Sequence, residues 1–176
     1  MIGVLALQGG VAPHLATLKA IGLSAAPVRT AEELLRVDGL VLPGGESGAQ
    51  LRLLSRHGLE GPLRALVASG KPVLATCAGL ILLARKVSRP EQWSLGVLDV
   101  DVERNAYGRQ LESFEATANG MRMVLIRAPR IVRAGAVEVL ARLDGEPVLV
   151  RQRNVFGATF HPELAGETAV HRMAFA

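Results

Sequence analysis

Short apolar runs alternate with amphipathic stretches through the first half of this chain, and this alternation limits the available folds more than any other feature. Apolar runs bounded by glycine, proline or polar residues predict strands over 2–7, 24–28, 39–42 and 73–76. Leucines at helical spacing predict helices over 13–21, 31–36, 51–69 and 80–87. Apolar strands that alternate with helices favour a mostly parallel sheet covered by helices on both faces.

The second half of the chain has a different texture. From about Leu95 onward, short strands joined by short loops are predicted, and some of them are expected to be antiparallel. These strands cover 97–102, 122–126, 137–142, 148–153 and 155–160. The chain shows no internal repeat or linker, so the sequence predicts one α/β domain over residues 1–176, with a β-rich C-terminal half.

The charge pattern argues against nucleic acid as a partner. The net charge is +4, but the arginines are spread along the chain, with modest groups at 127–133 and 151–153. Aromatic residues make up 3% of the sequence, which leaves few side chains on which bases could stack. A basic surface that faces solvent or an acidic partner is the simpler interpretation.

Membrane insertion is also not expected. No apolar run approaches the roughly 20 residues that a membrane-spanning helix requires. The N-terminal segment 1–10 has no basic residues ahead of its apolar run, so it resembles a first strand rather than a signal peptide. A cytoplasmic protein is therefore predicted.

The single cysteine, Cys77, lies in an apolar run, 73–82, that is interrupted by small residues. This pattern predicts a buried strand, a tight turn and the first turn of a helix, like the nucleophile elbow of hydrolases. A thiol near the positive end of a helix dipole favours its thiolate form. A lone cysteine cannot form an internal disulfide and is too little for a cysteine-based zinc site, so neither a metal nor a cofactor is expected. Cys77 alone could equally be a small buried apolar residue.

A second predicted strand ends at Pro43, and two glycines follow it. In open parallel sheets, ligands bind beyond the carboxyl ends of the strands. The backbone N–H groups of Gly44, Gly45 and Ala78 could therefore form an oxyanion hole, in which each donor contributes about 3–4 kcal/mol. Taken alone, this Pro-Gly-Gly segment is simply a turn.

His161 and Glu163 flank Pro162 near the C-terminus. Proline biases the residue before it toward an extended conformation, in which residues two apart project to the same side. Glu163 could then hold the imidazole of His161 in the tautomer that faces Cys77. An ordinary exit from a strand would show the same three residues. Cysteine, histidine and glutamate together indicate nucleophilic acyl chemistry.

Other readings stay open at this point. Segment 45–49 approximates a serine elbow, with Ser47 as nucleophile and His161 as its base. A different hydrolase or amidotransferase built on the same elbow and a non-catalytic binding module with the same fold are further alternatives. His14, His57 and His171 fall in or near predicted helices, where capping or surface roles are expected.

Five segments in this order and spacing resemble one known family, the glutaminase subunit of pyridoxal 5′-phosphate synthase. That family belongs to the class I, triad-type glutamine amidotransferases. The segments are 42–47 (LPGGES), 76–80 (TCAGL), 104–110 (RNAYGRQ), 126–129 (IRAP) and 160–164 (FHPEL). The resemblance extends from Gly3 nearly to the C-terminus and implies a flavodoxin-like, three-layer fold.

The resemblance also implies site residues and a partner. It implies that Cys77, His161 and Glu163 form the triad, and that L-glutamine is the substrate. The residues that it implies for glutamine binding are Gly45, Glu46, Ser47, Arg104, Ile126 and Arg127. The ammonia would pass to a separate, barrel-shaped synthase subunit. This sequence departs from the family at Ala75, where glycine is usual, and at 48–49, where hydroxyl residues are usual. A short final helix is expected.

Overall fold

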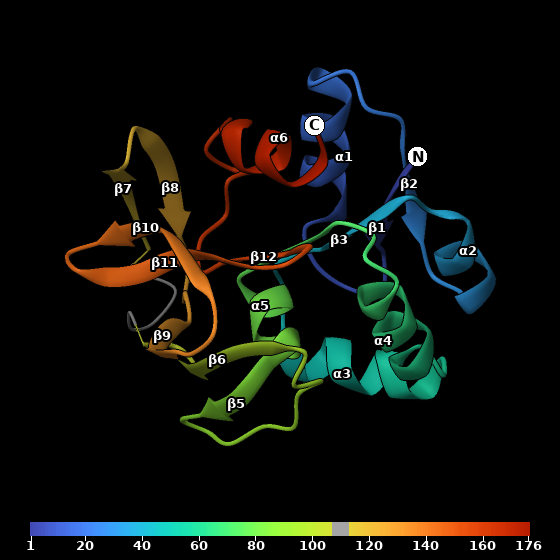
Figure 1. The fold of residues 1–176 in the computed structure, drawn as a ribbon, viewed down its shortest axis with the longest axis horizontal. Helices are drawn as coiled ribbons and strands as arrows, with labels where there is room; N and C mark the ends of the chain where they lie inside the picture. Colours follow the sequence, from blue (N-terminus) through green and yellow to red (C-terminus); the bar gives the residue numbers. More distant parts are fainter. Residues whose placement is uncertain (107–112) are drawn as a thin grey trace.

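The structure is a computed structural model that describes residues 1–106 and 113–176, and it is organised around one large sheet (Figure 1). The strand order of this sheet is β10-β11-β12-β4-β3-β1-β2. Its strands are β1 (Ile2–Leu5), β2 (Ala25–Val28), β3 (Gly39–Leu42), β4 (Val73–Thr76), β10 (Glu138–Leu143), β11 (Glu146–Gln152) and β12 (Val155–Ala158). The run from β2 to β12 is parallel, whereas β11 and β10 are antiparallel to their neighbours. The predicted α/β fold with a mostly parallel sheet is confirmed.

Helices cover both faces of this sheet, which gives the molecule three layers (Figure 1). On one face lie α1 (Val11–Ala20) and α6 (Ala169–Phe175), and the other face carries α3 (Ser47–Arg56), α4 (Glu60–Ala68) and α5 (Ala78–Leu83). The short α2 (Ala31–Arg36) lies at the β2 end of the sheet, beside α4. The final helix is short, as the sequence predicts.

Side chains that alternate along the central strands build two cores. In β3, Leu40 and Leu42 belong to one apolar cluster and Val41 belongs to the other. Leu74 of β4 joins the cluster of Val41, whereas Val73 joins the opposite one. All five side chains are fully buried, and this double burial explains why the strands are apolar without alternation.

Two smaller sheets extend the fold beyond the central one. The first has the order β5-β6-β9, formed by β5 (Ala84–Ser88), β6 (Leu98–Glu103) and β9 (Arg130–Ala134). The second is the hairpin of β7 (Phe114–Ala118) and β8 (Met121–Leu125). Methionine and leucine side chains of β8 enter the core beneath α1 and α6, so the hairpin is anchored at the edge where β12 ends.

The structure corrects some of the predicted elements. The predicted helix over 80–87 ends at Leu83, and Ala84 begins β5, because an apolar run of this kind suits a helix or a buried strand equally well. The predicted helical region 51–69 is two helices, α3 and α4, and Gly58 between them has a φ of +63°. Strands β7 and β9 were not predicted, because most of their side chains are not buried and they lack an apolar pattern.

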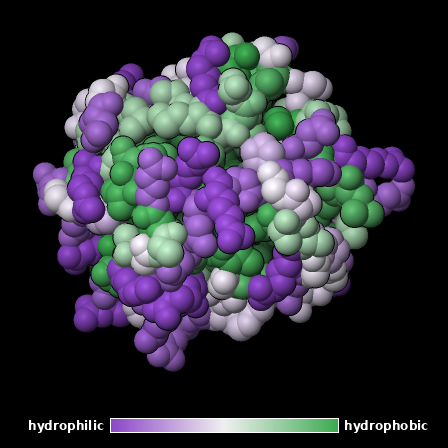
Figure 2. Space-filling model, viewed as in Figure 1, coloured by the Kyte–Doolittle hydropathy of each residue, from purple (hydrophilic) through white to green (hydrophobic). Residues whose placement is uncertain are grey.

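The surface is polar over the three-stranded β5-β6-β9 sheet. Figure 2 shows hydrophilic residues gathered over the part of this face where β5 and β6 lie. Arg85 pairs there with Asp101 at 2.6 Å, and Arg133 pairs with Asp99 at 2.7 Å. Within residues 1–106 and 113–176, none of the helices has both the length and the apolar character needed to cross a membrane.

Candidate active site

Cys77 lies at the corner between β4 and α5, as the apolar run with its small residues predicts. Its φ of +46° falls in the left-handed region, which is strained for a residue with a side chain and recurs at functional sites. Two residues later, a methyl group on Gly79 would stand 2.2 Å from the carbonyl oxygen of Leu42. Only glycine therefore lets α5 approach β3 so closely, and this approach fixes the corner that holds the sulfur.

His161 and Glu163 follow β12, the strand that pairs with β4. The backbone N–H of His161 donates to the carbonyl of Val124 at 2.8 Å, which ties this segment to β8. His161 Nδ1 lies 2.8 Å from Glu163 Oε1, so the carboxylate holds one ring nitrogen and leaves Nε2 for the thiol. The exposed fractions of Cys77, His161 and Glu163 are 6%, 8% and 7%. The three groups therefore interact largely out of water.

Electrostatics favour a charged imidazole at this site. Burial opposes the charge on His161, but its hydrogen bonds to Cys77 and Glu163 outweigh burial and raise its pKa to about 10. Burial would also raise the pKa of Glu163, yet the hydrogen bond from His161 and the electrostatic effect of the nearby histidine rings hold that pKa below its ordinary value. An ionised carboxylate beside an imidazolium is consequently the resting state near neutral pH.

A pocket of about 330 Å³ opens directly over Cys77 and His161. It gathers residues from the ends of several strands: Gln8, Gly9, Gly10, Gly44, Gly45, Glu46, Ser47, Cys77, Ile81, Arg104, Asn105, Ile126, Arg127, His161, Glu163 and Leu164. This set contains every residue that the sequence analysis assigned to the triad or to glutamine binding. Ala78 does not line it, but begins α5 directly after Cys77. Within the motif 104–110, residues 107–110 lie outside the described part of the chain.

The Pro-Gly-Gly segment is held in place by neighbours on two sides. The N–H of Gly44 donates to Thr76 Oγ1 at 3.1 Å, and its carbonyl accepts from Gly10 N at 2.9 Å. This N–H is engaged inside the protein, which differs from the expectation that it would face an oxyanion. Of the three predicted donors, those of Gly45 and Ala78 remain.

Gln8 supports this loop, although sequence reasoning did not single it out. Its side-chain oxygen accepts from the N–H of Glu46 at 2.8 Å, and its carbonyl accepts from Gln50 Nε2 at 2.9 Å. A methyl group on Gly45 would stand 2.4 Å from the same side-chain oxygen. Only its position in the sequence could have indicated a role at the site. Gln8 follows the first strand, at the sheet edge where the other site residues lie.

The predicted glutamine-binding residues form the outer part of the pocket. Arg104 Nη2 lies 3.4 Å from Glu46 Oε1, and the arginine side chain is 16% exposed. Ile126 and Arg127 follow β8, where Arg127 has a φ of +44°. A guanidinium at the rim suits recognition of a carboxylate.

Ser47 lies at the start of α3 and is 3% exposed. Its hydroxyl donates to Gln92 Oε1 at 3.0 Å rather than to a histidine. A nucleophilic serine needs a base within hydrogen-bond reach. This arrangement weighs against the serine elbow and leaves the thiol as the nucleophile that the site presents.

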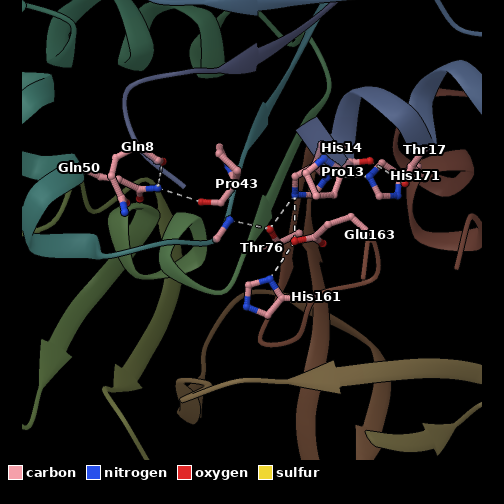
Figure 3. Close-up of polar contacts among 11 residues, drawn as sticks. Gln8, Pro13, His14, Thr17, Pro43, Gln50, Thr76, His161, Glu163 and His171 are labelled. Carbon is pink, nitrogen blue, oxygen red and sulfur yellow. Dashed lines mark hydrogen bonds and ion pairs between the residues drawn. The ribbon is translucent and has the colours of Figure 1, made fainter. Parts of the chain in front are cut away.

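His14 and His171 are the clearest correction to the sequence analysis. Both were expected in capping or surface roles, and both are fully buried. Figure 3 shows them behind Glu163, on the side away from His161. Nothing in the sequence links two histidines on helices so far apart in the chain, and the core position of each was hidden by its polar type. Among residues 1–106 and 113–176, no group of three or more histidine, cysteine or carboxylate side chains is arranged to hold a metal ion.

Known proteins resemble this chain over nearly its whole length. The sequence is 51% identical to a pyridoxal 5′-phosphate synthase subunit PdxT of Koribacter versatilis, over 98% of this chain and 92% of that protein. The subunit of the same name from Thermotoga sp. (strain RQ2) is 47% identical over 97% of this chain and 95% of its own length. A crystal structure described as a glutamine amidotransferase superposes with a TM-score of 0.91 at 46% identity, covering 98% of this chain and 96% of that one.

Fold and pocket together define an α/β protein of the class I glutamine amidotransferase type. The SNO glutamine amidotransferase family profile matches residues 4–175, and the chain belongs to that family. The family resemblance drawn from the sequence motifs is thereby confirmed.

Proposed function

We propose that this chain hydrolyses L-glutamine to L-glutamate and ammonia as the glutaminase subunit of a pyridoxal 5′-phosphate synthase. Cys77 serves as nucleophile, His161 as acid and base, and Glu163 as the group that orients the imidazole. The observation that carries the proposal is the convergence of these three groups, from β4 and from the segment after β12, at the floor of one pocket.

The first half of the reaction uses the charged imidazole. The thiolate of Cys77 attacks the side-chain amide carbon of glutamine and forms a C–S bond, and the carbonyl oxygen becomes an oxyanion. In this proposal the N–H groups of Gly45 and Ala78 donate to that oxyanion. His161 then donates its proton to the departing nitrogen, the C–N bond breaks, and ammonia leaves a γ-glutamyl thioester on Cys77.

The second half needs the same imidazole as a base. Once the sulfur is bound as a thioester, its negative charge no longer raises the pKa of His161. The neutral ring can then take a proton from water, whose oxygen attacks the thioester carbon. Release of glutamate restores the thiolate beside the imidazolium. Glu163 stays ionised throughout and holds Nδ1.

The pocket rim recognises the substrate's backbone groups. We propose that Arg104 binds the α-carboxylate, because a guanidinium matches that group with paired hydrogen bonds. Glu46, which already pairs with Arg104, lies where it can accept from the α-ammonium. Ser47, Ile126 and Arg127 complete the glutamine-binding wall.

The ammonia passes to a separate, barrel-type synthase subunit. Ammonia is mostly protonated near neutral pH and is then not a nucleophile, so direct transfer within a complex preserves its reactivity. We propose that residues 1–176 act as one glutaminase domain. Its activity is weak in isolation and becomes full once the synthase subunit orders the Pro-Gly-Gly segment, 43–45, that carries the Gly45 donor of the oxyanion hole. A cytoplasmic location suits a free catalytic thiol, which stays reduced there.

Glutamine hydrolysis measured with and without the synthase subunit tests the proposal. We expect ammonia release to rise on complex formation and to vanish in Cys77→Ala, with circular dichroism unchanged. An electrophilic glutamine analogue should label Cys77; labelling at Ser47 would support a serine hydrolase, and no labelling would support a binding module. Ammonia release above background in Cys77→Ala would rule out the thiol mechanism.

A further inference from the structure

Two buried histidines stand behind the triad and take no part in the reaction described above. His14 comes from α1 and His171 from α6, and neither side chain reaches solvent. Figure 3 shows an unbroken line of polar contacts that runs from His161 through Glu163 to His14 and then to His171. Buried polar groups at such a position call for a physical role.

His14 makes three polar contacts with its two ring nitrogens. Nδ1 lies 2.9 Å from His171 Nε2, and Nε2 lies 3.2 Å from Thr76 Oγ1 and 3.4 Å from Glu163 Oε1. Thr76 Oγ1 in turn accepts the N–H of Gly44. One imidazole therefore touches the acid of the triad and the residue that holds the glycine loop.

The 3.4 Å contact between His14 Nε2 and Glu163 Oε1 joins a neutral ring to a carboxylate and is not an ion pair between two charges. Burial lowers the pKa of His14 to about 4, although the Glu163 carboxylate opposes this shift. Burial likewise lowers the pKa of His171 to about 4. The ionisable groups that face His14 are Glu163 and His161 from the segment after β12 and His171 from α6. Near neutral pH, each of the two buried histidines carries one ring proton.

The contacts select one tautomer for each ring. Nε2 of His14 lies 3.4 Å from the Glu163 carboxylate and 3.2 Å from Thr76 Oγ1, which can accept from it, so the proton of His14 sits on Nε2. Nδ1 then accepts from the Nε2–H of His171. His171 Nδ1 is left without a proton, and it is also a buried ring nitrogen without a hydrogen-bond partner in the described structure. The opposite assignment would bury an unpaired N–H there and turn a lone pair of His14 toward a carboxylate.

Glu163 relies on its contact with His14 because, within the described residues, its other oxygen has no hydrogen-bond partner. Oε2 is buried and has no hydrogen-bond partner among the described residues, so the contacts with His161 and His14 both fall on Oε1. Without the N–H of His14, the carboxylate would be held by His161 and its local backbone, and its orientation would loosen.

We propose that His14 is a positioning residue for the glutaminase reaction, with its Nε2–H tautomer set by His171, and that it holds Glu163 and Thr76 in the arrangement the triad and the Gly44 loop require. The proposal rests on the proposed glutaminase function. It assigns α6 a part in the active site. No residue of α6 lines the pocket, but His171 on this helix fixes the tautomer of His14.

Replacing the ring tests the role of its N–H donor. His14→Phe keeps an aromatic ring without a donor, and His14→Gln keeps an amide N–H near the place of Nε2. We expect kcat of the complexed enzyme to fall between about 10- and 100-fold in His14→Phe, with KM changed less than about twofold, and to recover in large part in His14→Gln. The acidic limb of the kcat/KM profile should move to higher pH in His14→Phe, because the carboxylate loses a donor. His57→Gln, an exposed position at the end of α3, should match the wild type.

Nitrogen-15 NMR of the histidine rings reads the tautomers without reference to glutamine. At pH 7 we expect single protonation at Nε2 for both His14 and His171, and a shift of the His14 signals toward mixed tautomers in His171→Phe. Protonation of His14 at Nδ1, or at both nitrogens, would overturn the proposal even if glutaminase activity is confirmed. Equal loss of kcat in His14→Phe and His14→Gln, or no loss in either, would also overturn it. An inactive wild type with the expected tautomers would instead count against the proposed function alone.

Discussion

Gly44 lies against the imidazole of His161. A methyl group added to Gly44 would stand 2.2 Å from Cε1 of that ring and 2.9 Å from its Nδ1. The Pro-Gly-Gly segment, 43–45, and the proposed triad therefore meet at one close contact. A residue with a side chain at position 44 could not make this contact. Glycine is required here by the space that the ring occupies.

This contact predicts the effect of Gly44→Ala. The methyl group must displace the ring, and a displacement of about 1 Å at the reacting groups costs on the order of 100-fold in rate. We expect kcat for glutamine hydrolysis to fall by about that factor while the fold is retained. Gly61→Ala is the matched control: nothing lies within 4 Å of its new methyl group, and alanine within α4 should add about 0.5–1 kcal/mol of stability. Equal kcat in the two variants would refute the packing argument.

Glu163→Gln tests the charge behind the imidazole. The amide keeps the shape of the side chain but removes the negative charge, which contributes to the raised pKa of His161. We expect that pKa to fall and kcat/KM to drop by about 10²- to 10⁴-fold, within the range of a lost acid–base function. NMR titration of His161 in both proteins gives the pKa directly. An unchanged His161 pKa would mean that Cys77 alone sets the charge of the ring.

The sequence was sufficient for the central architecture because several local signals agree there. Strands 39–42 and 73–76 have the same bounds in the structure, since each is buried on both faces and ends at a proline, glycine or cysteine turn. The Cys77 corner and the His161 segment were identified by spacing and residue type. Both sit at strand ends, where local sequence dictates the backbone.

What the sequence could not give depends on contacts between distant segments. The pairing of His14 with His171 joins helices at opposite ends of the chain, and periodicity does not encode it. The engagement of the Gly44 N–H by Thr76 likewise depends on how closely β3 and β4 pair. The change from helix to strand at Ala84 was missed for another reason: the apolar run over 80–84 suits a helix or a buried strand equally well, and periodicity does not distinguish them.

Arg104→Lys addresses substrate recognition. A lysine keeps the positive charge but cannot present paired N–H groups to a carboxylate, and a lost charged hydrogen bond costs about 1.5–3 kcal/mol. We expect KM for glutamine to rise by about 10- to 100-fold, with kcat changed far less, because the α-carboxylate is bound equally in the ground and transition states. Steady-state kinetics on the complex separate the two constants. A fall in kcat at constant KM would place Arg104 in the chemistry instead.

The buried histidines predict how stability depends on pH. In the folded protein the pKa values of His14 and His171 are lowered to about 4, whereas the unfolded chain titrates near the ordinary value of 6.5. Between these values the unfolded state binds more protons, so their contribution is fully present above about pH 6.5 and is lost as the pH falls toward 4. Between pH 6.5 and 5, the contribution of each histidine to the free energy of unfolding should drop by about 1.5 kcal/mol.

The other shifted groups at the site have little effect between pH 5 and 6.5, but His161 opposes the histidine pair above pH 6.5. The contribution of His161 to the free energy of unfolding is fully present below pH 6.5 and is lost as the pH rises from there through about 10. The contribution of Glu163 is fully present above its unfolded value of about 4.5 and is lost only as the pH falls below it. Urea denaturation at pH 6.5, 5.8 and 5 therefore isolates the histidine pair. The double variant His14→Gln/His171→Gln should lose most of the slope, and His57→Gln should keep it. A wild type that is equally stable at pH 6.5 and 5 would show that the two rings are not held neutral by burial.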